Sequence, residues 1–156
     1  MTPELICIVG PTAIGKTALS LKLAHLFSTE ILSADSRQFF KEMSIGTAVP
    51  SEEELKVAKH HFIQHVSIHD DYNVGKFEQE ALKIIHSIFE NKNKAILVGG
   101  SGLYQKAVTE GLDKFPEIPQ HIRDKYNTIL EQHGIEGLQT ILKEKDIKTF
   151  NSIDIF

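Results

Sequence analysis

The chain has 156 residues, of which 41% are hydrophobic and 24% charged, and its net charge is −4 because 17 lysine and arginine residues stand against 21 acidic ones. This composition is typical of one soluble globular domain, and the single cysteine excludes an intramolecular disulfide framework. No apolar run approaches the roughly 20 residues of a membrane span, and no signal peptide precedes the first apolar run, so we expect a cytoplasmic protein with no membrane contact. The acidic balance argues against nucleic-acid binding by bulk charge, although recognition through a pocket stays open.

Strand and helix patterns alternate along the chain as far as Gly111. The apolar run within Glu4–Val9 predicts a strand buried on both faces, with Cys7 as a small core residue. Lys16–Phe27 has the apolar spacing of a helix, and Asn73 is expected to cap a long amphipathic helix. The other expected elements, in chain order, are a strand over 30–34, a short helix after Ser51, an extended segment over 60–67, a strand over 94–98 and a helix that closes near Gly111.

This alternation predicts an α/β fold over residues 1–112, in which helices flank a parallel sheet. From residue 113 to residue 156 the pattern is helical, with two stretches joined at Gly134. We therefore expect two parts, an α/β core and a helical appendage.

The segment from residue 10 to residue 17 carries the clearest chemical signal. It fits the pattern G-x-x-x-x-G-K-[ST] at every fixed position and lies between a predicted strand and a predicted helix, as this phosphate-binding loop requires. Its backbone amides and the positive end of the helix are expected to hold a diphosphate or triphosphate. Lys16 would contact the outer phosphate, and the Thr17 hydroxyl would bind Mg²⁺. The residues of the loop are Gly10, Pro11, Thr12, Ala13, Ile14, Gly15, Lys16 and Thr17.

A second group of polar residues follows the strand predicted over 30–34. Ligands of open α/β sheets lie beyond the carboxyl ends of the strands, so Asp35 and Ser101 are both expected near the phosphate loop. Asp35 could serve as a general base or bind Mg²⁺ through water, or it could simply cap a turn. Arg37 and Gln38 offer donors for a base edge or a phosphate, or Arg37 is a solvated surface residue. No carboxylate follows the strand over 94–98, which weakens the hypothesis of a motor or switch GTPase.

Four segments in this order resemble the tRNA dimethylallyltransferases, also called tRNA isopentenyltransferases. They are GPTAIGKT over 10–17, DSRQ over 35–38, IGTA over 45–48 with Pro50, and GGSGLY over 99–104. The resemblance implies a P-loop NTPase-like fold followed by the start of a helical insertion domain over 113–156. The chain departs from the family at Phe40, where a Tyr is common, and at Gln64, where an Asp is common.

The resemblance also implies a reaction, in which a dimethylallyl group passes from dimethylallyl diphosphate to N6 of the adenine beside the anticodon in tRNA. Family members hold the diphosphate and Mg²⁺ on the loop, so Thr17 would be the metal ligand. Asp35 would be the base and would touch the tRNA. The other residues that the resemblance assigns to tRNA binding are Ser36, Arg37, Gln38, Ser101 and Arg123.

Two other functions stay open. A small-molecule or nucleotide kinase uses the same loop, but it should carry an arginine-rich lid, and this chain has only Arg37 and Arg123. The other alternative is a phosphate-binding fragment that is inactive without its C-terminal half. This alternative stays open because family members are longer than this chain. We expect a monomer that acts on the tRNA anticodon loop.

The histidines between residues 60 and 69 are expected to have packing or surface roles, since no cysteine accompanies them in a metal-binding pattern.

Overall fold

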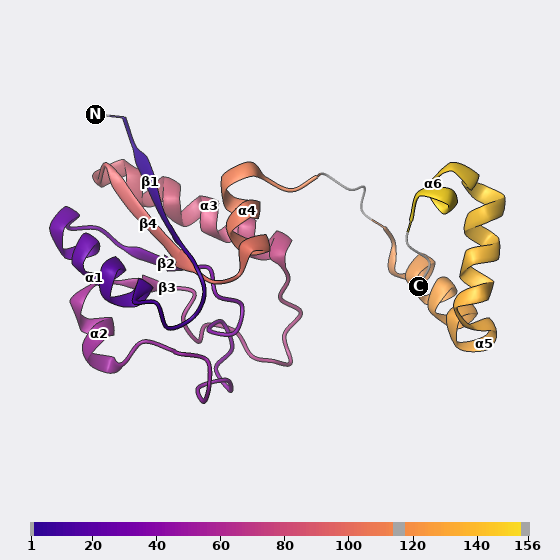
Figure 1. Ribbon diagram of the computed structural model, residues 1–156, viewed down its shortest axis with the longest axis horizontal. Helices are drawn as coiled ribbons and strands as arrows, with labels where there is room; N and C mark the ends of the chain where they lie inside the picture. Colours follow the sequence, from indigo (N-terminus) through magenta and orange to yellow (C-terminus); the bar gives the residue numbers. More distant parts are fainter. Residues whose placement is uncertain (1, 114–117, 154–156) are drawn as a thin grey trace. The chain divides into compact units, whose positions relative to one another are not determined.

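The elements of residues 1–112 follow one another in the predicted order. The structure, a computed structural model, describes residues 2–113 and 118–153. The elements of the first part are β1 (Glu4–Val9), α1 (Lys16–Phe27), β2 (Ile31–Ser33), α2 (Glu52–Val57), β3 (His60–His61), α3 (Val74–Asn91), β4 (Lys94–Gly99) and α4 (Gly102–Glu110), as Figure 1 shows. Two further helices, α5 (Gln120–Lys145) and α6 (Ile147–Ser152), belong to the second part.

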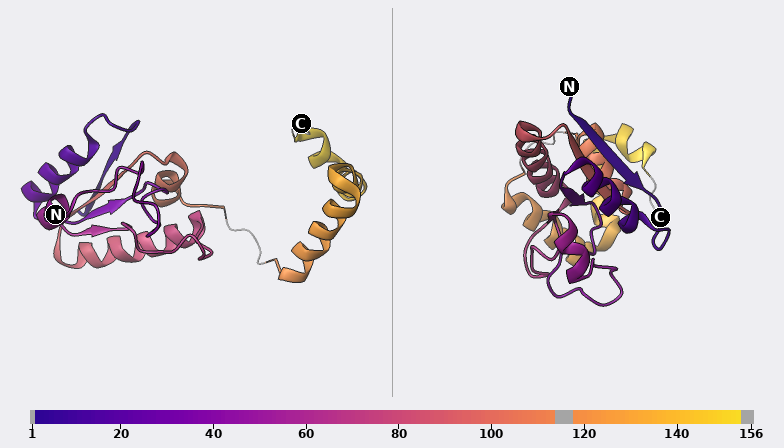
Figure 2. Two further views of the ribbon diagram at one scale, coloured as in Figure 1. Left: turned by 90° about the horizontal axis from the view of Figure 1, so that it is seen from below. Right: turned by 90° about the vertical axis from the view of Figure 1, so that its left-hand side faces the viewer.

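The four strands form one parallel sheet in the order β1-β4-β2-β3. Parallel neighbours need a crossover connection, and the helices between the strands provide it. The sheet lies between α1 and α3, which cover opposite faces (Figure 2). All strands therefore point their carboxyl ends toward the same edge, where the loops that follow β1, β2 and β4 meet.

Alternating residues of the central strands build a core on each face of the sheet. Ile31 and Ile96 are buried against Ala24 of α1, whereas Leu32 and Leu97 belong to the larger cluster on the side of α3. Successive side chains of a strand point to opposite faces, so a run of apolar residues serves both layers. The two central strands thus behave as buried parallel strands should.

The strand β1 differs from its prediction. Its bounds are as expected, but Ile8 is its one buried residue, Val9 is 61% exposed and Cys7 is exposed rather than part of the core. The reason is its place in the sheet, since β1 pairs with β4 and forms an edge of the described sheet. An apolar run predicts a strand, but it does not show which strands flank it.

The extended segment predicted over 60–67 is also shorter than expected. The strand β3 contains His60–His61, and Phe62 and Gln64 have positive φ angles of 65° and 47°. Residues with such angles cannot continue a strand. A single bridge between Phe40 and Val66 is what remains of strand pairing in this region.

The chain divides into two compact units, Met1–Leu112 and Asp113–Phe156. In the second unit α5 is interrupted at Gly134, whose φ of 63° and ψ of −168° are not helical, where the sequence predicts a junction between helices. Residues 114–117 and 154–156 of the predicted insertion lie outside the described residues. Among the described helices, none combines the length and apolar character that crossing a membrane requires.

Candidate functional site

The phosphate loop joins β1 to α1 and has the backbone that a phosphate cradle needs. Gly10, Ala13 and Gly15 have positive φ angles of 155°, 66° and 91°. Gly15 occupies the position before α1 in a left-handed conformation that glycine adopts without a Cβ clash. The first amides of α1 are thus left to point at a bound anion, because helix N-termini carry unpaired N–H groups.

The two loop side chains that the sequence predicts to contact phosphate and Mg²⁺, Lys16 and Thr17, lie at the start of α1. Lys16 Nζ donates a hydrogen bond to the Pro11 carbonyl at 2.6 Å, so the ammonium group is held across the loop. Ser20 is buried and donates to the Thr17 carbonyl at 2.8 Å, which fixes the first turn of the helix. These two hydrogen bonds therefore hold Lys16 and the backbone of Thr17 in a defined geometry at the mouth of the phosphate loop.

Asp35 follows β2 and is held beside the segment that follows β4. Ala34 N–H donates to the Val98 carbonyl at 2.7 Å, and Ser101 N–H donates to the Ala34 carbonyl at 3.3 Å. One Asp35 oxygen, Oδ1, accepts the Arg37 backbone N–H at 3.1 Å. The other, Oδ2, makes no hydrogen bond within the part of the chain that the structure describes. A carboxylate oriented through one oxygen and free at the other suits a general base.

Ser36 and Ser101 form the second link between these two strand ends. The Ser36 N–H donates to Ser101 Oγ at 3.1 Å, and the two hydroxyl oxygens lie 3.2 Å apart. Gly99 packs so closely on β2 that a Cβ at this position would lie 2.3 Å from the Ala34 carbonyl oxygen. The turn after β4 can reach Asp35 because this position has no side chain.

Two cavities meet at this edge of the sheet, and Asp35 and Thr12 line both. The first has a volume of about 360 Å³ and contains Lys16, Thr17 and Asp35. Its remaining wall includes the apolar residues Ala18, Ala48, Pro50, Ile63 and Val98. The second has a volume of about 330 Å³ and is lined by Thr12, Asp35, Ser36, Arg37, Gly100 and Ser101. Both volumes fall in the range of small-molecule pockets.

The sequence-predicted site residues are distributed between these cavities. Gln38 lines the first cavity together with five of the eight loop residues, Thr12, Ala13, Gly15, Lys16 and Thr17, whereas Gly10, Pro11 and Ile14 line neither cavity. Ser36, Arg37 and Ser101 gather with Asp35 in the second cavity. Arg123 is exposed on α5, in the second unit, and its contact with tRNA stays a prediction. Thr17 and Asp35 bring oxygen atoms to one cavity, and oxygen ligands are what Mg²⁺ selects, so the residues present fit this ion.

The structure adds residues that the sequence interpretation did not assign to the site. Ser33, Glu54 and His60 also line the first cavity. Ser33 could have been found from the sequence, because a hydroxyl stands there at the end of an otherwise apolar strand. No comparable signal marks Glu54 or His60, which reach the cavity through the packing of α2 and β3.

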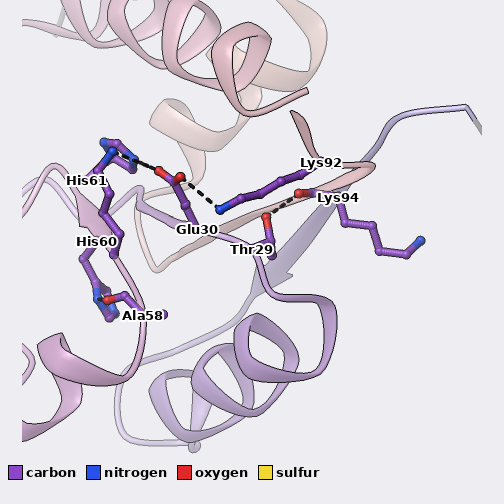
Figure 3. Close-up of polar contacts among 8 residues, drawn as sticks. Thr29, Glu30, Ala58, His60, His61, Lys92 and Lys94 are labelled. Atoms are coloured by element: carbon purple, nitrogen blue, oxygen red, sulfur yellow. Dashed lines mark hydrogen bonds and ion pairs between the residues drawn. The ribbon is translucent and has the colours of Figure 1, made fainter. Parts of the chain in front are cut away.

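The hydrogen bond of His60, which lines the first cavity, selects one tautomer of its ring. Its Nδ1 lies 2.8 Å from the Ala58 carbonyl oxygen (Figure 3), and a carbonyl only accepts, so Nδ1 carries the proton. Burial lowers the pKa of His60, although the Ala58 carbonyl and the Glu54 carboxylate oppose this effect. The ring is therefore neutral near pH 7, with Nε2 as an acceptor.

Several known proteins are similar to this chain. A family model described as IPP transferase matches residues 38–155. A tRNA dimethylallyltransferase of Christiangramia forsetii is 55% identical over 155 residues, which is 99% of this chain and 51% of that protein. One from Flavobacterium johnsoniae is 58% identical over 97% of this chain and 49% of its own length. The chain thus spans about half the length of the curated relatives it matches.

Solved structures agree with this similarity. The full-length tRNA isopentenylpyrophosphate transferase of Bacillus halodurans superimposes with a TM-score of 0.70 at 32% identity, over 99% of this chain and 51% of that protein. A eukaryotic dimethylallyltransferase acting on tRNA gives a TM-score of 0.82 at 25% identity, over 99% of this chain and 38% of its own. These proteins have a P-loop NTPase-like fold, so the predicted fold class is confirmed. The family matches and the shared fold together show that the chain belongs to the IPP transferase family.

Proposed function

We propose that the protein transfers a dimethylallyl group from dimethylallyl diphosphate to N6 of the adenine beside the anticodon of tRNA. The observation that carries this proposal is that Asp35 lines two cavities at once. One contains a phosphate loop, and the other is lined mainly by polar groups. A transfer reaction needs a donor and an acceptor on either side of one catalytic group, and this arrangement provides both places.

The first cavity suits the donor. The diphosphate would lie on the loop amides and Lys16, and the short hydrocarbon tail would meet the apolar wall that includes Ala48 and Ile63. Thr17 would help to hold Mg²⁺, which supplies neutralising charge to the leaving diphosphate when bound. Phosphate-binding and apolar surfaces within one cavity match the two ends of a prenyl diphosphate.

The second cavity suits the acceptor. An adenine turned out of a single-stranded loop would enter beside Ser36, Arg37 and Ser101, which offer hydrogen-bond donors and acceptors for its edge. The C1–O bond of the donor breaks, a C1–N6 bond forms, and the N6 proton passes to the Asp35 carboxylate. Loop amides and Lys16 stabilise the charge that gathers on the diphosphate. Relatives named tRNA dimethylallyltransferase, 55% and 58% identical to this chain, support this assignment.

The test uses the full-length protein with dimethylallyl diphosphate and an anticodon stem-loop that contains the target adenine. Prenylated adenosine should appear in a nuclease digest, and Asp35→Asn should lower the rate by about 10²- to 10⁴-fold while donor binding persists. Asp71→Asn, an 88% exposed side chain outside both cavities, is the matched control and should keep the wild-type rate. Full activity of the Asp35 variant would refute the base assignment, and ADP formation from ATP without prenylation would favour a kinase.

A further inference from the structure

A chain of side-chain hydrogen bonds runs from the backbone of Asp35 to a distant loop. The Asp35 N–H donates to Ser33 Oγ at 3.3 Å, and Ser33 Oγ donates to Gln38 Oε1 at 2.8 Å. Gln38 Nε2 then donates to the Ala48 carbonyl at 2.8 Å and to the Thr47 carbonyl at 3.3 Å. Ser33 is 2% exposed, so the central part of this chain is protected from water.

The loop that receives these bonds, residues 43–50, is packed at the buried Thr47 but makes few other hydrogen bonds to the rest of the described chain. Gly46 and Ala48 have positive φ angles of 75° and 50°, and Thr47 Oγ1 donates to the Met43 carbonyl within the loop itself. Within the described part of the chain, the hydrogen bonds that join residues 44–50 to another segment are the two from Gln38. This loop nonetheless supplies Ala48 and Pro50 to the wall of the first cavity.

We propose that Gln38 is a positioning residue that holds residues 43–50 as the wall of the donor cavity and couples this wall to the Asp35 backbone. This role rests on the proposed function, and it differs from the tRNA contact that the sequence resemblance implies for Gln38. Both N–H groups of its amide donate to internal carbonyls, and it lines the first cavity, whereas the neighbouring Arg37 lines the second. Gln38 therefore serves the donor.

An amide is the one neutral side chain of this length that can perform both tasks. Its oxygen accepts from Ser33 while its NH₂ group donates to two carbonyls. Methionine preserves the length and removes all three bonds, and the loop carbonyls then lose the donor that fixes them. Loss of hydrogen bonds at this junction leaves the loop free to leave the cavity wall.

The experiment compares wild-type full-length protein with Gln38→Met and with the matched control Gln64→Met. Gln64 lies outside both cavities, and its amide makes one long contact of 3.5 Å with the Lys41 carbonyl. For Gln38→Met we expect amide hydrogen exchange over residues 44–49 to rise about tenfold and the donor KM to rise about tenfold, which is the effect of losing roughly one or two net hydrogen bonds. The tRNA KM should stay within about twofold of wild type. The control should change none of these quantities.

A second variant guards against failure of the first to fold. Ser33→Ala removes the donor to Gln38 and keeps the loop bonds, so it should move loop exchange and donor KM in the same direction by a smaller factor. Unchanged loop exchange together with a raised tRNA KM in Gln38→Met would overturn the proposal and make Gln38 a tRNA contact. If even the wild-type protein transfers no prenyl group, the proposed function fails, while hydrogen exchange in the absence of substrate still decides whether Gln38 holds the loop.

Discussion

Glu30 contacts three basic side chains at the end of the sheet opposite the cavities. We predict that Glu30→Gln lowers the free energy of unfolding by an amount that depends on pH. Its carboxylate lies 2.7 Å from His61 Nε2, 3.1 Å from Lys92 Nζ and 3.2 Å from Lys59 Nζ. Figure 3 shows His61 and Lys92 directed at the carboxylate from two different segments. Glu30 therefore joins the starts of β2, β3 and β4, and its neutral analogue loses these charged contacts.

The pKa of Glu30 sets the magnitude of the effect. Burial by itself would raise this pKa, but the hydrogen bonds from the three neighbours outweigh burial and lower it from 4.5 to about 2. A tenfold difference in proton affinity between folded and unfolded states corresponds to about 1.4 kcal/mol, so the carboxylate contributes about 3 kcal/mol above pH 4.5. Solvent screens part of this interaction, since Lys59 is 67% exposed, and we expect about 2 kcal/mol.

The sign of the pH dependence follows from the lowered pKa. The stabilisation is complete above pH 4.5, where the unfolded carboxyl is also ionised, and it disappears as the pH falls to about 2. Urea unfolding of full-length wild type and Glu30→Gln should therefore differ by about 2 kcal/mol at pH 7 and by about half of that at pH 3. The control Glu53→Gln, at an exposed position of α2, should differ from wild type by less than about 0.5 kcal/mol. An equal difference between wild type and Glu30→Gln at both pH values would refute the reasoning.

Three further predictions concern stability. Gly99→Ala should cost about 2 to 3 kcal/mol in urea unfolding, because the new Cβ would meet the Ala34 backbone. Asn73→Ala should lower stability by about 1 kcal/mol in thermal unfolding, because the Asn73 side chain accepts the Lys76 N–H at the start of α3. Burial lowers the pKa of His65, so wild type should lose stability as the pH falls below 6.5. His65→Phe should reduce that loss in urea titrations at several pH values, since neither buried ring nitrogen has a hydrogen-bond partner among the described residues, while the lowered pKa of His60 keeps the remainder.

Much of the fold could be predicted because it depends on local chemistry. The helix α1 begins and ends where the apolar spacing and the phosphate loop indicate, and Asn73 caps α3 as expected. Ser51 also caps α2, the short helix expected after it, and Glu54 closes the reciprocal bond. Such signals lie within a few residues of the element that they define, so a single sequence contains them.

The exposure of Cys7 could not be predicted in the same way. Burial of a strand depends on which strands pair with it, and β1 is an edge strand because β4, ninety residues later in the register, occupies one side. The early end of β3 has a similar cause, because the positive φ angle of Phe62 belongs to the packing of its ring among other aromatic residues. The local pattern of apolar residues therefore predicts neither the exposure of Cys7 nor the early end of β3.

The site lies between these two cases. That Asp35 and Ser101 would meet could be inferred from the rule that parallel strands end at one edge, and their segments are indeed joined through Ser36. The same rule cannot separate Arg37 from Gln38, which are neighbours in sequence and line different cavities. Beyond the end of the strand the chain turns, and the direction of each side chain there depends on the hydrogen bonds that its own atoms can make. For Gln38 these are the hydroxyl of a buried serine and two carbonyls of a loop nine and ten residues away, so its position depends on partners that the motif does not contain.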